Sequence, residues 1–203
     1  MGSGPFRNYL RSNWLPTMST QPLKMANAST RTVLANVTAD QMQNTSPCAS
    51  WNVASIVNHV IGAQGFFVAG MTGQRPSSEE VDYSAGDFLA AYDAATQATV
   101  DCFEADGALD GMVKMPFGEM PGRAVLGLAM TDTFTHGWDL AKATGQSTDL
   151  APELAAQLLE ASRQMIQPGF RGEDGAAPFG VEQECPDGAC NADQLAAFLG
   201  RTL

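Results

Sequence analysis

The sequence has 203 residues, 44% of them apolar, and its acidic residues outnumber its basic ones by 22 to 11. A chain of this length can bury about 70% of the surface that its unfolded form exposes, so we expect one domain. The net charge of −11 argues against a nucleic-acid partner, because proteins that bind a phosphate backbone need a basic face.

The N-terminal segment is basic and contains no acidic residue before Asp40. That composition is formally similar to an organelle transit peptide. We favour a simpler interpretation, in which residues 1–20 are an N-terminal extension, disordered or non-native, and Met18 is a natural start. The folded part of the chain is therefore expected over residues 21–203.

From Gln21 onward, apolar residues recur at spacings of three and four, which predicts helices over residues 21–37 and 53–71. Asn52 is suited to cap the second helix and Gly73 to end it.

The second predicted helix holds the longest apolar stretch of the chain, residues 56–71. Asn58, His59 and Gln64 interrupt this stretch, which is also shorter than the roughly 18 apolar residues of a membrane-spanning helix. We therefore expect a soluble protein with no membrane partner.

A third helix is predicted over residues 87–105, where acidic residues near the start suit the helix dipole. Two prolines and three glycines make residues 110–122 a connection, with a short extended piece at 112–115. A fourth helix is predicted from Pro121 to Gly145, because proline is favoured in the first turn and glycine after the last.

A fifth helix is predicted over residues 152–167, followed by a long loop over 168–189. The second half of that loop is either a lid near a site or a surface loop. A short terminal helix begins at Asn191 and is stopped by Gly200. The fold class is therefore all-α, an up-and-down four-helix bundle with cross-connections, short additional helices and a long C-terminal loop.

Four cysteines are too few at this length for a secreted disulfide scaffold, so a reducing compartment and a cytoplasmic location are expected. Cys185 and Cys190 are close enough in sequence for a loop disulfide. The reducing environment favours two thiols instead.

The fourth predicted helix carries polar residues on its apolar face, within the sequence "DTFTHGWDL" at 132–140. Asp132, His136 and Asp139 fall in the same sector as the apolar Val125 and Leu140. Burying a carboxylate there costs several kcal/mol unless it meets a cation or strong donors. The four-residue spacing lets Asp132 and His136 converge on one ion.

The only other histidine, His59, lies on the flank of the apolar stripe of the second helix. Bundle interiors build metal sites from histidines and carboxylates that project inward from facing helices. The alternative is a set of buried polar side chains that satisfy one another by hydrogen bonds. Taken together, the residues favour a metal site at His59, Asp132 and His136.

Four neighbouring residues have two interpretations each. Asp139 either orients a ligand imidazole through its second nitrogen or pairs with an arginine such as Arg123 or with a helix end, which we favour. Trp51 and Trp138 either line the pocket or, as we favour, anchor the packing. Cys48 either approaches the metal or is a small structural apolar residue, which we favour.

Three segments together resemble an uncharacterised, actinobacterial-type branch of the DinB-like metalloprotein superfamily, related to the N-terminal domain of mycothiol-dependent maleylpyruvate isomerase. They are "SPCASWNVASIVNHVIGA" (46–63), "PFGEMPGRAVLGLAMTDTFTHGWDLAKATGQ" (116–146) and "PFGVEQECPDGACNADQLAAFLGR" (178–201). The similarity spans residues 22–201. It implies a four-helix bundle over residues 21–203 with a three-ligand divalent metal site, whose ligands match His59, Asp132 and His136.

Two departures from the family accompany the resemblance. The isomerase uses a glutamate where this chain has Asp132. It also has an additional C-terminal domain that contributes to its active site and that we do not expect in this chain, so maleylpyruvate isomerisation itself is not the expected reaction.

The expected function is that of a divalent-metal-dependent enzyme of the thiol-transferase or isomerase type. Two histidines and one carboxylate leave a coordination position open, where the ion would activate a low-molecular-weight thiol or a water toward a small-molecule substrate. The resemblance implies mycothiol as the thiol co-substrate. Zinc is the expected metal, with nickel or iron as alternatives.

Other functions remain open at this point. One alternative is a metal-binding or stress-related accessory protein without turnover, and another is a non-haem iron enzyme. A homodimer formed through the helices is a further expectation.

Overall fold

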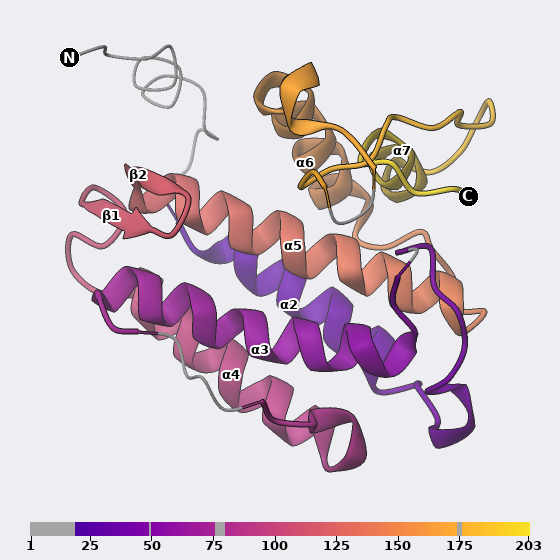
Figure 1. The fold of residues 1–203 in the computed structure, drawn as a ribbon, viewed down its shortest axis with the longest axis horizontal. Helices are drawn as coiled ribbons and strands as arrows, with labels where there is room; N and C mark the ends of the chain where they lie inside the picture. The colour runs from indigo at the N-terminus through magenta and orange to yellow at the C-terminus, as the bar shows by residue number, and fades with distance from the viewer. Residues whose placement is uncertain (1–18, 49, 76–79, 174–175) are drawn as a thin grey trace.

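The structure is a computed structural model that describes residues 19–48, 50–75, 80–173 and 176–203 (Figure 1). The predicted extension at 1–20 falls, apart from its last two residues, outside these ranges. The described residues form the predicted all-α fold with one small hairpin. The main helices are α2 (Gln21–Leu34), α3 (Val53–Thr72), α4 (Phe88–Glu104), α5 (Gly122–Ala143), α6 (Pro152–Met165) and α7 (Asn191–Phe198).

The smaller elements connect these helices. Single 3-10 turns occur at Ala39–Gln41, Tyr83–Ala85 and Pro168–Phe170. The strands β1 (Met112–Met115) and β2 (Gly118–Pro121) form an antiparallel hairpin. The extended piece predicted at 112–115 is therefore confirmed, and its partner strand occupies the residues just before α5.

Local signals explain where the helices begin and end. The Asn52 side chain accepts a hydrogen bond from the Ser55 amide at 2.9 Å, and Gly73 ends α3 with φ 70°, as predicted. The prediction for the first helix is three residues too long, because Val37 packs into the core from the turn that follows Leu34. Its apolar spacing therefore continues the helical pattern beyond the helix.

One other end also differs from prediction, because the fifth helix ends at Met165 rather than at residue 167. The helix α7 begins at Asn191 as predicted, and the Sγ of the preceding Cys190 caps it by accepting a hydrogen bond from the Asp193 amide at 3.4 Å.

The bundle consists of α2, α3, α4 and α5, and α5 packs between α2 and α3 (Figure 1). Near the ends of α5 and α2, the Gln146 side chain donates to the Val33 carbonyl, so these helices run in the same direction. The helices α3 and α4 also share a direction, opposite to that of α2, because the start of α4 lies beside the start of α3, where the Ser84 amide donates to the Asn58 side chain. The predicted cross-connections are thus present, and they interrupt strict alternation of helix direction.

A buried polar layer links all four bundle helices between two apolar clusters. The Thr30 hydroxyl of α2 donates to the Thr133 carbonyl of α5 at 2.9 Å. The Gln64 side chain of α3 donates to the Thr133 hydroxyl at 3.1 Å, and the Thr99 hydroxyl of α4 lies 3.4 Å from the Gln64 carbonyl. Because directional bonds join specific residues, this layer sets the register of α3 against α5 one residue from Asp132.

The C-terminal part of the chain packs over α5, on the side where α6 and α7 are drawn in Figure 1. Arg171 fastens the loop to α7 by donating to the Gly180 and Phe198 carbonyls at 2.9 and 2.7 Å. Gly200 has φ 98°, and a Cβ there would lie 2.5 Å from the Gly180 backbone. Because neither Gly180 nor Gly200 has a side chain, the loop can cross the chain directly before Arg201.

Most of α5 is buried on more than one face, because the C-terminal helices cover the side that the bundle leaves open. Among the described residues, α3 is the one helix whose length and apolar composition would suffice to cross a membrane. That is weak evidence, since core helices meet the same test. The expectation of no membrane partner stays a prediction.

Close packing of α2 on α5 should make Gly137 intolerant of a side chain. A Cβ at Gly137 would lie 2.2 Å from the Thr30 Oγ1 and 3.2 Å from its Cα, whereas a Cβ at Gly65 would meet no atom within 4 Å. We expect Gly137→Ala to lower the free energy of unfolding by about 1–3 kcal/mol. The control Gly65→Ala should raise it by about 0.5–1 kcal/mol, because alanine favours helix.

Urea unfolding followed by circular dichroism measures both effects. Equal stability changes in the two variants would contradict the close approach of α2 and α5.

Candidate metal centre

The three predicted ligand residues lie together on the side of the bundle where α3 meets α5. The Asp132 Oδ1 is 3.1 Å from the His59 Nε2 and 3.7 Å from the His136 Nε2. One ligand atom from each residue lies within 4.8 Å of the others. The fold thus brings together residues that are 73 positions apart in sequence.

The site is half open rather than fully enclosed. The side chains of His59, Asp132 and His136 are 30, 25 and 9% exposed. The expectation that Asp132 is fully buried needs correction, because its side chain forms part of a cavity wall. Its Oδ2 is nevertheless buried and has no hydrogen-bond partner among the described residues.

Asp132 is held in its ionised form. Burial alone would raise its pKa, but the hydrogen bond with His59 and the electrostatic interactions with His136, His59 and Arg201 hold the pKa below its ordinary value. An ionised carboxylate with a buried oxygen that has no hydrogen-bond partner is a strong ligand for a cation.

The donor set fits a divalent metal ion. Imidazole nitrogens and carboxylate oxygens bind zinc at about 2.0–2.2 Å, which places tetrahedral ligands about 3.3 Å apart. The two distances from the Asp132 Oδ1, 3.1 and 3.7 Å, bracket that value. The residues could therefore hold an ion with little rearrangement and leave a position open.

Asp139 fixes the protonation pattern of His136. Its Oδ2 lies 2.9 Å from the His136 Nδ1, and its side chain is fully buried. Burial would raise the pKa of Asp139, but the His136 hydrogen bond and the Arg201 charge hold it below its ordinary value. An ionised carboxylate can only accept, so Nδ1 carries a proton, and Nε2 is the nitrogen that faces Asp132 and is placed to bind a metal ion.

Arg201 is the site residue that sequence reasoning missed. Its guanidinium donates to both Asp139 oxygens at 3.1 and 3.3 Å. Asp139 therefore has both of its predicted roles, but the arginine is not Arg123, so that pairing was wrong. The pair lies 62 residues apart, and the sequence contains no local signal for it.

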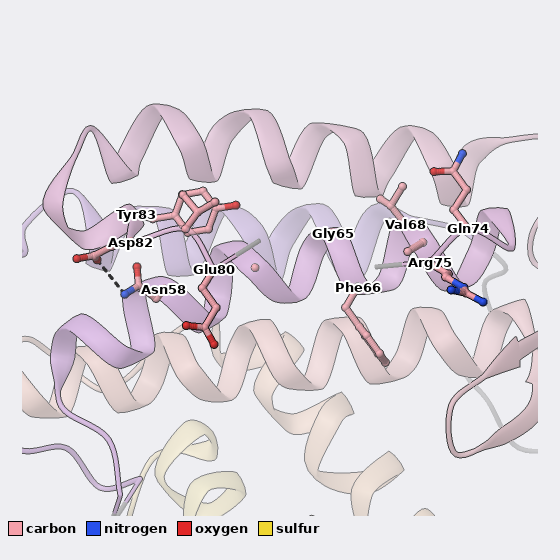
Figure 2. Close-up of a pocket in the computed structure, with 12 residues that line it drawn as sticks. Asn58, Gly65, Phe66, Val68, Gln74, Arg75, Glu80, Asp82 and Tyr83 are labelled. Atoms are coloured by element: carbon pink, nitrogen blue, oxygen red, sulfur yellow. Dashed lines mark hydrogen bonds between the residues drawn. The ribbon is translucent and has the colours of Figure 1, made fainter. Parts of the chain in front are cut away.

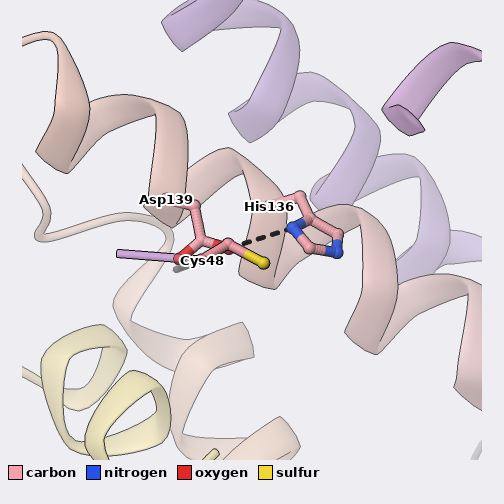
Figure 3. Close-up of side chains that lie close together, drawn as sticks. All are labelled: Cys48, His136 and Asp139. Atoms are coloured by element: carbon pink, nitrogen blue, oxygen red, sulfur yellow. Dashed lines mark hydrogen bonds and ion pairs between the residues drawn. The ribbon is translucent and has the colours of Figure 1, made fainter. Parts of the chain in front are cut away.

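Cys48 lies beside the same histidine, on the opposite ring edge from Asp132. Figure 3 shows its sulfur near the Asp139 carboxylate and the His136 ring, and the three ligand atoms lie within 4.8 Å of one another. Cys48 thus lies next to a candidate ligand but on the ring edge away from His59 and Asp132, so its approach to a metal ion stays a prediction. It faces the His136 nitrogen that already donates to Asp139.

The two tryptophans have different roles. The Trp51 ring lies 4.6 Å from the His59 ring and 5.2 Å from the His136 ring, centroid to centroid, so it covers both ligands. Trp138 is buried in the core and donates to Asp193 at 2.8 Å. The packing interpretation is therefore right for Trp138, whereas Trp51 both packs against an apolar cluster and lines the second cavity.

All four cysteines lie in the described part of the chain, and they form no disulfide. Cys185 and Cys190 are therefore two thiols, as favoured from the sequence.

A cavity of about 490 Å³ opens onto the three candidate ligands. Pro178 and Phe179 of the C-terminal loop line it, so the start of that loop covers the site as one interpretation expected. The apolar side chains in its wall include Phe66, Phe67, Phe117, Leu128, Met165 and Phe179.

A second cavity of about 580 Å³ lies on the other side of His136. Cys48, Glu173 and Gln183 line it, and His136 and Arg201 belong to the walls of both cavities. A larger hollow of about 950 Å³ lies between α3 and residues 80–83, away from the ligands (Figure 2). Asn58 and Asp82 are hydrogen-bonded to each other there, and the hollow contains no histidine.

Comparison with known proteins gives consistent results. Residues 23–141, more than half of the chain, match the family described as the mycothiol maleylpyruvate isomerase N-terminal domain. Two proteins of Mycobacterium tuberculosis, each described as uncharacterized, are 44% identical over 171 residues, which cover 84% of this chain and 91% of theirs.

Solved structures show the same relation. The mycothiol-dependent maleylpyruvate isomerase and a mutant of it match with a TM-score of 0.54, at 14% and 13% identity. The matches cover 70% of this chain and 67% of the isomerase chain. At this identity the likeness shows the fold, and it confirms the DinB-like bundle.

Removing the Asp139 charge should loosen the site and destabilise the fold. In Asp139→Asn, the buried Arg201 loses its counter-ion, so we expect unfolding to become easier by about 3 kcal/mol. Because the orientation of His136 is also weakened, Zn²⁺ affinity should fall about 10–100-fold. Calorimetric metal titration and chemical unfolding measure the two effects.

The same variant has a defined pH signature. The pKa of Asp139 is lower in the folded state than the unfolded value of about 3.9. Ionised Asp139 therefore stabilises the fold above about pH 4, and this stabilisation is lost as the pH falls through the pKa of the folded state. Asp139→Asn has no such carboxylate, so its free energy of unfolding should fall less over that pH range. Asp93→Asn, at the exposed pair with Arg31, is the control and should leave Zn²⁺ affinity unchanged. Equal metal affinity in all three proteins would contradict the role of Asp139.

Proposed function

The chain belongs to the family of the mycothiol maleylpyruvate isomerase N-terminal domain, and we propose that it is a divalent-metal-dependent enzyme of the thiol-transferase or isomerase type. His59, Asp132 and His136 are the proposed ligands, and zinc is the proposed metal, with nickel or iron as alternatives. Mycothiol is the proposed thiol, because the isomerase that shares this fold is mycothiol-dependent.

The observation that carries this proposal is the environment of Asp132. Its Oδ1 lies between two imidazole nitrogens, and its buried Oδ2 has no partner among the described residues. Hydrogen bonding among the three side chains would give a partner to the Asp132 Oδ1 but not to its Oδ2. A cation accounts for the second oxygen as well as for the convergence of both histidines of the chain on one point.

A bound divalent ion would supply the positive charge that lowers the pKa of a thiol or a water at the open position. The chain's residues supply the rest. Asp139 keeps the proton of His136 on Nδ1 and thereby presents Nε2 to the site. Trp51 covers both imidazoles and limits the access of water from its side. The 490 Å³ cavity remains as the space for an electrophile next to the thiol.

In a transfer by addition, the thiolate sulfur would form a bond to one carbon of an activated carbon–carbon double bond, the π electron pair would move to the activating group, and a proton from solvent would replace the one that the thiol had lost. In an isomerisation, rotation about the resulting single bond would come before that proton arrives, and the electron pair would then re-form the double bond and expel the thiolate. Neither step requires a separate general base, since the thiol loses its proton at the site.

One observation favours a second candidate, a metal-binding accessory protein without turnover. Among the described residues that line the cavity, Arg201 is the one ionisable side chain besides the three ligands, and it is paired with Asp139. Chemistry that needs a free general base would have no residue for it there. Activity measurements with a thiol, which needs none, separate the two functions.

Metal content tests the ligand assignment. We expect about one equivalent of Zn²⁺ per chain in protein purified without chelating resin, and a loss of at least about 100-fold in affinity in Asp132→Asn, since the neutral amide is a poor ligand. Asp110→Asn, at an exposed carboxylate, should bind metal like the unmodified chain. Substoichiometric metal that does not change between these proteins would remove the metal-enzyme proposal.

Thiol activation is tested in a Co²⁺-substituted sample. Addition of mycothiol should change the visible absorption of cobalt and accelerate thiol addition to an electrophile over the uncatalysed rate. A spectrum and a rate that mycothiol leaves unchanged, with cobalt bound, would favour the accessory function.

A further inference from the structure

We propose that the cavity of about 490 Å³ beside the candidate ligands takes an uncharged, apolar molecule of aromatic-ring size, and not a small carboxylic acid. This inference rests on the proposed function, because it names the class of electrophile that would meet the activated thiol. The cavity wall, the charges around it and the neighbouring second cavity support it.

The cavity wall is apolar beyond the ligands. Phe66 and Phe67 project from α3, and their rings lie 5.6 Å apart, edge to face. Phe117, at the turn of the β1–β2 hairpin, lies 6.4 Å from Phe66 and is 60% exposed, so it stands at the mouth of the cavity. Aromatic walls of this kind favour flat apolar ligands, through contact area and ring stacking.

The charges around the cavity disfavour an anion. Arg201 is the one cationic side chain among the described residues of its wall, and both Asp139 oxygens accept hydrogen bonds from it. Asp132 contributes a negative charge to the same wall, and the whole chain carries a net charge of −11. A dicarboxylate would therefore lose its hydration without gaining a free cationic side chain, and in the proposed function the thiol takes the open position of the metal ion.

The volume and the second cavity are consistent with this ligand class. A volume of about 490 Å³ falls in the range typical of small-molecule sites, roughly 300–1,000 Å³. The cavity of about 580 Å³ on the other side of His136 has Glu173 and Gln183 in its wall and suits the polar part of a thiol. His136 and Arg201 line both cavities, so the polar part of a thiol can lie beside the site without occupying the apolar cavity.

The test uses the full chain, prepared both metal-free and with added Zn²⁺, and two probes. Naphthalene represents the proposed class and maleate represents the small dicarboxylates. In the metal-free protein, ligand-observed NMR should show saturable naphthalene binding and no maleate binding at the same concentrations.

Two variants place a cation in the cavity. Leu128→Lys changes a half-buried wall residue, and Phe117→Lys changes the exposed residue at the mouth, so the second variant keeps the test valid if the first does not fold. Each should weaken naphthalene binding at least about tenfold, because the new charge opposes desolvation of the wall. Val81→Lys, at the larger hollow beside α3, is the matched control and should leave naphthalene binding unchanged.

The outcomes separate this inference from the proposed function. Maleate binding as tight as that of naphthalene in metal-free protein, or naphthalene binding that both variants leave unchanged, would overturn the inference. Metal content measured on the same samples tests the function by itself. If naphthalene binds in the cavity but the chain binds no metal, the inferred ligand class is supported and the proposed metal-dependent enzyme is contradicted.

Discussion

The Asp132 carboxylate, placed between two histidines at the edge of an apolar core, is the constraint that organises this structure. Its charge is expensive to desolvate, and one oxygen has no partner among the described residues. The surrounding structure reflects that cost. The α3 and α5 helices bring His59 and His136 to the carboxylate, and Trp51 packs over both rings. A core assembled for stability alone would place an apolar side chain at this position.

The geometry of the site around Asp132 depends on contacts between residues that are far apart in the sequence. The layer joining Thr30, Gln64 and Thr133 holds α3 against α5 on one side of the site. On the other side, the C-terminal segment crosses at Gly200 so that Arg201 reaches Asp139, which in turn orients His136. The helices α6 and α7 therefore belong to the site as well as to the fold, because they deliver the cation that keeps Asp139 ionised within the protein.

Sequence periodicity predicted the helices and the three side chains that lie together between α3 and α5, since spacing along a helix is a local property. The i, i+4 arrangement of Asp132 and His136 and the core-side position of His59 required no tertiary information. The pairing of Asp139 with Arg201 did require it, and the nearby Arg123 was the wrong choice. The end of the first helix was misjudged for a related reason, because Val37 reaches the core from a turn and keeps the helical spacing without the helix.

Fold and substrate class are determined by different parts of such a chain. The bundle is shared with the mycothiol-dependent maleylpyruvate isomerase at 14% identity, so backbone packing and a few directional contacts suffice to maintain it. The cavity wall is made of side chains that the bundle itself does not require, such as the exposed Phe117 on the hairpin. Substitution at those positions can change the ligand while the arrangement of His59, Asp132 and His136 stays the same. A relative's substrate is therefore a weaker guide to this site than the charge and shape of its own wall.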